Sequence, residues 1–205
     1  AQMDRSFRQG MSWFIVSEVM FFMAFFGALF YGRVIALDWL SGGSNNAMTF
    51  EILWPSFEAM WPLLKTPGGI ETQAMPATGL PLINTAILVI SSVTLHFAHT
   101  GLEQNKRGQL KIMLLVTLLL GATFLGLQVY EYIHAYRDLG LTLASGFYGN
   151  TFFLLTGFHG MHVTLGAIIL LFVFLRVLKG HFTPEKHFAF QAAAWYWHFV
   201  DVVWL

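Results

Sequence analysis

Glu18 is the residue whose type and position most clearly indicate chemistry, because it is the one charged side chain in the apolar stretch from Trp13 to Tyr31. Phenylalanines, among them Phe14 and Phe22, stand one helical turn before and after it. An aromatic, apolar environment disfavours a charged carboxylate. We therefore expect Glu18 to be protonated at neutral pH unless a partner or water reaches it. The alternative is a structural role, in which a neutral carboxyl group hydrogen-bonds to a Ser, Thr or His of another helix.

Histidines occur in pairs, three residues apart, on two further apolar stretches. His96 and His99 form the first pair, and His159 and His162 form the second. Because residues i and i+3 lie on the same face of a helix, two such pairs could hold a haem or a metal ion. The spacing does not show that the rings converge. The alternative to a haem or metal site is that each imidazole hydrogen-bonds to a neighbouring helix.

Two more stretches carry polar side chains along one side. Gln128, Glu131 and His134 share a helix face, which we expect to be solvated or bonded to a loop. His198 and Asp201 lie one turn apart and can pair. That pair could be a proton relay or an ion pair that fixes packing. The sequence has no phosphate loop, nucleophile elbow or zinc-protease pattern, which argues against the common kinds of active site.

The composition places these residues in a membrane. The chain is 56% hydrophobic and only 11% charged, too little charge to cover a soluble globule of 205 residues. Lys+Arg and Asp+Glu number 11 each, so no basic surface suggests a nucleic-acid partner. Cysteine is absent, which excludes disulfides and cysteine metal ligands.

Five apolar stretches are long enough to cross a bilayer core of about 30 Å as helices. We predict an all-α, integral membrane bundle forming one domain over residues 1–205, with helices at about 11–34, 80–101, 110–135, 148–178 and 188–205. The connection 35–79 is rich in Pro, Gly and aromatic residues, and we expect it to lie outside, at the interface. Most Lys and Arg fall on the side of the N-terminus, which predicts that this side is cytoplasmic. We also expect the natural chain to begin upstream and to continue past Leu205.

Four segments together resemble a known family. They are SEVMFF at 17–22, GLPLINT at 79–85, YGNTFFLLTGFHGMHV at 148–163 and AAAWYWHFVDVVWL at 192–205. In this order and at these separations they resemble subunit III of haem–copper cytochrome c oxidase, over nearly the whole chain. The connection 35–79 and the lack of cysteine favour a bacterial member, and so the bacterial inner membrane over the mitochondrial one.

The resemblance implies an accessory, non-redox subunit of a proton-pumping aa3-type oxidase in the aerobic respiratory chain. Haem and copper would belong to partner subunits, so this chain would hold no cofactor or metal of its own, although bound phospholipid is expected. Subunit I would be its main contact, with subunit II in the same complex and cytochrome c as the substrate of the complex. The expected roles are stabilising subunit I during turnover, supporting proton uptake and lining a lipid-filled route for dioxygen.

The resemblance also assigns residues. Glu18 matches the family's carbodiimide-reactive carboxylate, and the family places no metal at the matching histidines, so no catalytic residue is expected. The remaining candidates would be structural or would line the lipid cleft: Glu131, His159, His162, His198 and Asp201.

Two departures from the family pattern stand out. Many members have two further helices before the first one seen here, and Gln191 stands where the family usually has Glu. Three other functions stay open on the sequence. They are subunit III of a quinol oxidase, which the carboxylate of SEVMFF disfavours, a small membrane cytochrome whose paired histidines bind haem, and a transporter built around Glu18, without the broken-helix pairs that transporters often show.

Overall fold

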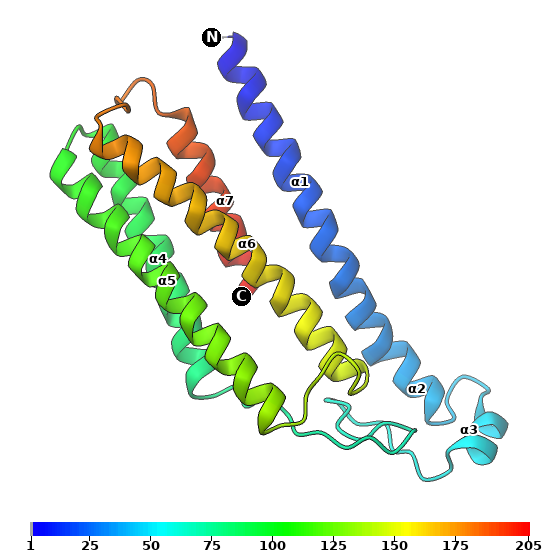
Figure 1. The fold of residues 1–205 in the computed structure, drawn as a ribbon. Coiled ribbons are helices and arrows are strands. Elements are labelled where there is room, and N and C mark those ends of the chain that lie inside the picture. Colours follow the sequence, from blue (N-terminus) through cyan, green and yellow to red (C-terminus); the bar gives the residue numbers. More distant parts are fainter. Residues whose placement is uncertain (1) are drawn as a thin grey trace. The chain divides into compact units, whose positions relative to one another are not determined.

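A computed structural model describes residues 2–205 and contains helices without any β-strand over that range, which confirms the all-α prediction (Figure 1). The elements in chain order are α1 (Gln2–Phe30), the π-helical turn η1 (Tyr31–Ala36), α2 (Leu37–Leu40), α3 (Ala47–Leu53), α4 (Leu80–Glu103), α5 (Arg107–Arg137), α6 (Phe147–Leu178) and α7 (Phe188–Trp204).

Four helical stretches are long and apolar enough to cross a membrane. They are the 39-residue run Gln2–Leu40 and the helices α4, α5 and α6. These stretches make the protein an integral membrane protein. The fifth predicted span, α7, has 17 residues, slightly fewer than the roughly 20 that a membrane helix needs. The count of five spans therefore stays a prediction.

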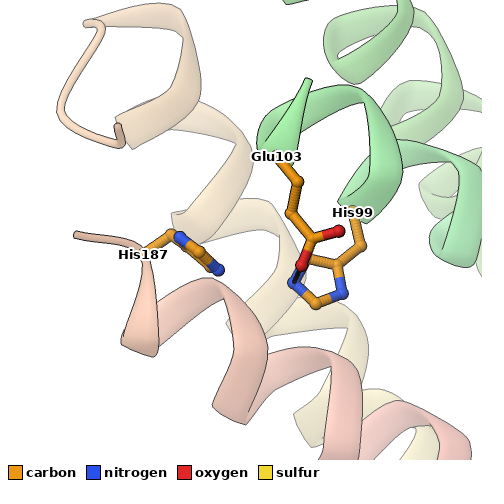
Figure 2. Close-up of side chains that lie close together, drawn as sticks. All are labelled: His99, Glu103 and His187. Carbon is orange, nitrogen blue, oxygen red and sulfur yellow. Dashed lines mark ion pairs between the residues drawn. The ribbon is translucent and has the colours of Figure 1, made fainter. Parts of the chain in front are cut away.

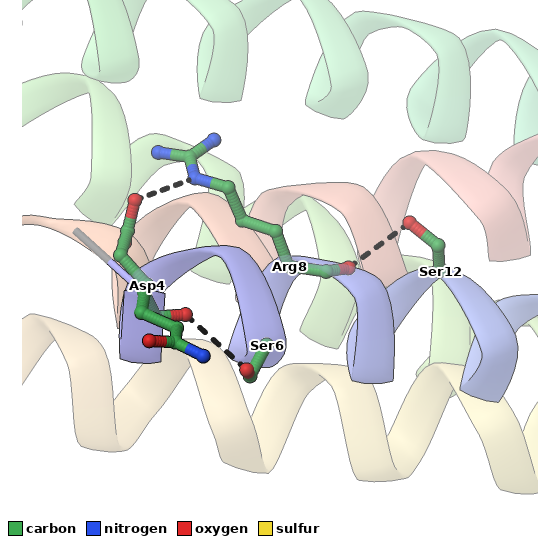
Figure 3. Close-up of polar contacts among 5 residues, drawn as sticks. Asp4, Ser6, Arg8 and Ser12 are labelled. Atoms are coloured by element: carbon green, nitrogen blue, oxygen red, sulfur yellow. Dashed lines mark hydrogen bonds and ion pairs between the residues drawn. The ribbon is translucent and has the colours of Figure 1, made fainter.

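The first helix begins at Gln2, nine residues before the predicted start near Met11. Polar side chains stabilise these early turns locally (Figure 3). Arg8 Nε donates to Asp4 Oδ2 over 3.1 Å, and the hydroxyl groups of Ser6 and Ser12 each donate to the carbonyl four residues earlier. The Arg8–Asp4 pair at i, i+4 supports these turns, and of residues 2–10 only Met3 and Phe7 are strongly apolar, which is why hydropathy alone placed the start too late.

The helix also ends later than predicted. It continues through η1 and α2 to Leu40, so the predicted loop 35–79 starts inside a helix and contains α3 as well. The part of this connection that follows α3 contains an isolated β-bridge between Lys65 and Glu71.

The chain forms two compact units, which we describe separately. The first unit comprises the residues up to Val19, Ala77–Glu131 and Phe158–Leu205, and the second comprises Met20–Pro76 and Tyr132–Gly157. Leu37, Phe57 and Leu63 form an apolar cluster in the second unit, packed against Phe147 among others. Gly32 allows this packing, because a Cβ there would overlap the ring of Phe147.

Trp197 of α7 is the centre of the first unit's packing. It is 1% exposed, and glycines of α5 and α6 make room for its indole ring. A Cβ at Gly121 would lie 2.7 Å from the ring, and one at Gly166 would lie 2.9 Å from it. The indole N–H donates to Ser91 Oγ of α4 over 3.0 Å. At the last residue of α7, Trp204 Nε1 donates to Thr85 Oγ1 over 3.0 Å. Tryptophans thus fasten α7 to α4 by both packing and hydrogen bonds.

Candidate functional site

Glu18 lies against a histidine of α6. Its Oε2 is 2.7 Å from His162 Nε2, and both residues belong to the first compact unit. The side chain of His162 is 6% exposed and that of Glu18 is 21% exposed. The structure therefore supplies the partner on which the prediction for Glu18 was conditional, and the partner is a histidine of another helix, as the structural reading anticipated.

The hydrogen bonds of His162 decide how protons are arranged in this pair. Its Nδ1 lies 2.7 Å from the carbonyl oxygen of Phe158, and because a carbonyl only accepts, Nδ1 must carry a proton. The contact with Glu18 then needs one more proton, on either Nε2 or the carboxyl group. Both arrangements leave the pair with no net charge, which suits an apolar environment. The geometry thus describes a neutral pair that holds one shared proton.

Aromatic rings surround this pair. Tyr196 of α7 stacks on the His162 ring with centroids 6.4 Å apart, and Phe14 stacks on Tyr196 at 6.0 Å. Phe14 and Tyr196 also line an apolar groove of about 550 Å³ between α1, α6 and α7. The rest of its lining is apolar too: Phe7, Met11, Leu165, Ile169, Phe188, Ala189, Ala192 and Ala193. The pair and the groove therefore share two aromatic walls.

His159 does not join His162 in a ligand set. Its Nε2 donates to the carbonyl oxygen of Val200 over 3.1 Å, and its ring packs against Phe124 and Trp204 with centroids 5.8 Å and 4.8 Å away. The ring is 3% exposed. His159 thus connects α6 to α7 as a structural residue, while its neighbour one turn away binds Glu18.

His198 and Asp201 do not form the predicted pair. His198 Nδ1 instead lies 2.5 Å from Ser92 Oγ of α4, and no ion pair joins it to Asp201 within residues 2–205. Both carboxyl oxygens of Asp201 are buried and accept no hydrogen bond of standard geometry in the described chain, although Ser92 is close enough to interact with the carboxyl group. Spacing of i, i+3 allowed the pair, but the imidazole bonds to the hydroxyl group that α4 places beside it.

The bond between His198 and Ser92 changes the expected effect of substitutions on α7. His198→Ala should lower the free energy of unfolding of the full chain in detergent by about 1 kcal/mol, because it breaks a hydrogen bond and leaves Ser92 unpartnered. Asp201→Ala should cost less, since it removes a buried carboxyl group that accepts no hydrogen bond of standard geometry in the described chain. Chemical unfolding of both variants checks the order. An Asp201 variant as unstable as the His198 variant would restore the predicted pair.

The polar face of α5, which we expected to be solvated or bonded to a loop, is mostly buried among the helices. Gln128 and Glu131 are buried at 6% and 3% exposure. Gln128 Oε1 accepts a bond of 3.4 Å from Asn84 of α4, whereas Glu131 Oε1 has no partner among the described residues. His134 is exposed and bonds to Asp138 over 2.6 Å, one turn further on. Glu131 is thus buried, whereas the His134 side chain is 43% exposed.

The whole chain also matches the sequence profile of a known family. The profile described as cytochrome c oxidase subunit III matches residues 1–205. The chain belongs to the cytochrome c oxidase subunit III family. It is 43% identical over 202 residues to "Cytochrome c oxidase subunit 3" of Loxodonta africana, a match that covers 98% of this chain and 67% of the relative. This confirms the resemblance drawn from the four sequence segments.

Other animal proteins of the family show a similar match. The mouse protein of the same name is 41% identical over 202 residues, which cover 98% of this chain and 67% of the relative. The protein of Drosophila melanogaster is 45% identical over 200 residues, which cover 97% of this chain and 65% of the relative. The chain thus spans about two thirds of the length of these relatives. These relatives are eukaryotic, so the bacterial origin stays a prediction.

His162 was among the candidates from the sequence, as half of a His-x-x-His pair and as a structural or lipid-cleft residue. The sequence did not identify it as the partner of Glu18. One feature of the sequence could have predicted the pair. An isolated acid lies in one apolar helix and a histidine in another, and a buried charged group needs a partner that can carry the opposite charge. Gln191, the departure from the family's Glu, has a buried Oε1 without a partner among residues 2–205.

Proposed function

We propose that this chain is an accessory, non-redox subunit III of a proton-pumping aa3-type cytochrome c oxidase. In this role it stabilises subunit I during turnover, with subunit II and cytochrome c as further partners of the complex, and it supports proton uptake. Membership of the subunit III family supports the assignment to an oxidase. The names of the relatives favour cytochrome c over quinol as the electron donor.

The observation that carries the mechanistic part is the neutral pair of Glu18 and His162. A carboxyl group bonded to an imidazole can pass one proton between its two partners without creating net charge in an apolar region. Glu18 is the more exposed partner, so protons would enter or leave through its carboxyl group. The pair would thus act as a proton-holding group beside the path by which the complex takes up protons.

The histidines support the assignment of haem and copper to partner subunits. His159 and His162 form one of the two His-x-x-His pairs that could have held a haem. In the structure one of them donates to the Val200 carbonyl, and the other bonds to Glu18 and to the Phe158 carbonyl. A haem ligand needs a free nitrogen directed at the iron, and this pair does not direct two such nitrogens to one place. The contacts of this pair therefore favour the oxidase subunit over a small membrane cytochrome.

The apolar groove between α1, α6 and α7 suits the acyl chain of a phospholipid. Its lining is apolar, and at about 550 Å³ it has room for part of one chain. We predict that Ala192→Trp, which places a large ring in the groove, lowers the phospholipid retained per complex after detergent purification by about one molecule. Mass spectrometry of extracted lipids measures this. Met20→Trp, on an exposed position outside the groove lining, is the control, and equal lipid loss in both variants would contradict the assignment.

We place five spans in an energy-coupling membrane, with the N-terminus, the α4–α5 turn and the α6–α7 connection on the cytoplasmic side. The bacterial inner membrane is the proposed location. The excess of Lys and Arg at the ends of the chain's helices on that side supports this orientation.

Affinity purification of the tagged chain from native membranes tests the assignment. The purified complex should show the absorption bands of haem a and should oxidise reduced cytochrome c with uptake of dioxygen. A complex that oxidises quinol but not cytochrome c would support the quinol oxidase instead. Purification of the chain without any haem protein would contradict both.

A further inference from the structure

Two histidines and a glutamate converge where α4 ends and α7 begins (Figure 2). His99 and Glu103 lie one turn apart near the end of α4, and His187 immediately precedes α7. One ligand atom of each residue lies within 4.8 Å of those of the other two. All three residues belong to the first compact unit. Among residues 2–205 this is the one group of three or more His and acidic side chains that converges in this way.

His187 is held with one nitrogen available. Its Nδ1 lies 3.3 Å from the carbonyl oxygen of Thr183, and because a carbonyl only accepts, Nδ1 carries the proton. The neutral ring then has its lone pair on Nε2. A backbone carbonyl that fixes the tautomer in this way is the usual second partner of a metal-binding histidine.

His99 offers a second nitrogen. Its Nε2 is buried and has no hydrogen-bond partner within the described chain. The nearest acid is Glu103, whose Oε1 lies 3.7 Å away, too far for a hydrogen bond. The rings of His99 and His187 have centroids 5.5 Å apart and are inclined at 65°. A buried nitrogen without a partner calls for a ligand or an unseen partner.

We propose that His99, Glu103 and His187 form a binding site for a divalent cation of the zinc class. Two imidazoles and one carboxylate are typical ligands of Zn²⁺, and three protein ligands leave a fourth position for water. Ligands at about 2.0–2.1 Å from a tetrahedral ion lie roughly 3.3 Å apart, so the three groups must close by up to about 1.5 Å. Glu103 is exposed and can rotate to meet the ion.

The three residues also span a junction that a metal would fasten. The ion would tie the C-terminal turn of α4 to the first residue before α7, and a cation bound only by the folded chain stabilises it. Because one ligand is exposed and one position is open, we expect the ion to exchange with solvent rather than to be permanent. The bound ion would have no redox role, and the proposed site does not depend on the proposed oxidase function.

Equilibrium dialysis against Zn²⁺, with the metal measured by mass spectrometry, tests the site in the full chain in detergent. The parent chain should bind one Zn²⁺ more per chain than His187→Asn, a substitution that keeps a good helix N-cap while removing the imidazole. Glu103→Gln should weaken Zn²⁺ binding by at least about tenfold, since an amide is a poorer ligand than a carboxylate. Bound Zn²⁺ should also raise the thermal midpoint of the parent chain and not that of His187→Asn.

His134→Ala is the matched control. His134 and Asp138 form a similar pair at i, i+4 with a 2.6 Å contact, but no third ligand converges on them within residues 2–205. This variant should bind Zn²⁺ like the parent chain. Equal Zn²⁺ binding by the parent chain and His187→Asn would overturn the proposal, as would loss of the same ion in His134→Ala.

Discussion

Trp197→Ala should lower the free energy of unfolding of the full chain in detergent by about 3–5 kcal/mol, the usual cost of emptying a large buried aromatic site. Trp197 is 1% exposed, and the two glycines against its ring, Gly121 and Gly166, have no side chains that could fill its place. The substitution also leaves Ser91 Oγ without its indole donor. Reversible unfolding with increasing denaturant, followed by circular dichroism, measures the change.

Trp13→Ala is the control for this result, because Trp13 is 66% exposed on α1. Its loss should change the free energy of unfolding of the chain by less than about 0.5 kcal/mol. A similar loss of stability in both variants would show that Trp197 is not the centre of the packing. Gly166→Val should reproduce part of the effect, because its side chain would meet the indole ring.

His162→Ala should have the second largest effect, a loss of about 1–3 kcal/mol in the free energy of unfolding. It leaves the Glu18 carboxyl group without its 2.7 Å contact in a mostly buried position. In the intact oxidase, the same variant should shorten the period of activity during turnover, because the proton-holding pair is lost.

Glu18→Gln separates the structural effect of the hydrogen bond to His162 from the effect of an exchangeable proton at residue 18. A glutamine amide can still donate to the His162 ring, so assembly and stability should stay close to those of the parent. Proton uptake or turnover lifetime should change modestly, since the amide has no exchangeable acid. A Glu18→Gln variant as unstable as His162→Ala would contradict the shared-proton account, and one with the lifetime of the parent would leave Glu18 a structural role only.

The membrane class and the long helices could be predicted from the sequence because each depends on residues that are near one another in the chain. Hydropathy located α4, α5 and α6 within a few residues of their observed bounds. It missed the first nine residues of α1 because they are mostly polar, although the Arg8–Asp4 pair supports the helix there and Phe7 stacks on Phe188.

The pairings between helices could not be predicted, because they depend on which faces meet. The sequence indicated that His198 pairs with Asp201. In the structure His198 instead bonds to Ser92 of α4, which is 106 residues away in sequence. Glu18 likewise bonds to His162, which is 144 residues away in sequence. Periodicity places a residue on a face of its own helix and does not say which residue of another helix that face meets.

The lifetime of the oxidase's activity tests most directly whether this chain keeps the enzyme active as an accessory subunit. The measurement counts how many turnovers a purified oxidase completes before it inactivates, with the chain present and after its removal. Removal should leave the initial rate of cytochrome c oxidation largely intact while the enzyme inactivates after far fewer turnovers. An oxidase that lacks the chain yet remains active for as many turnovers as the intact complex would contradict the account.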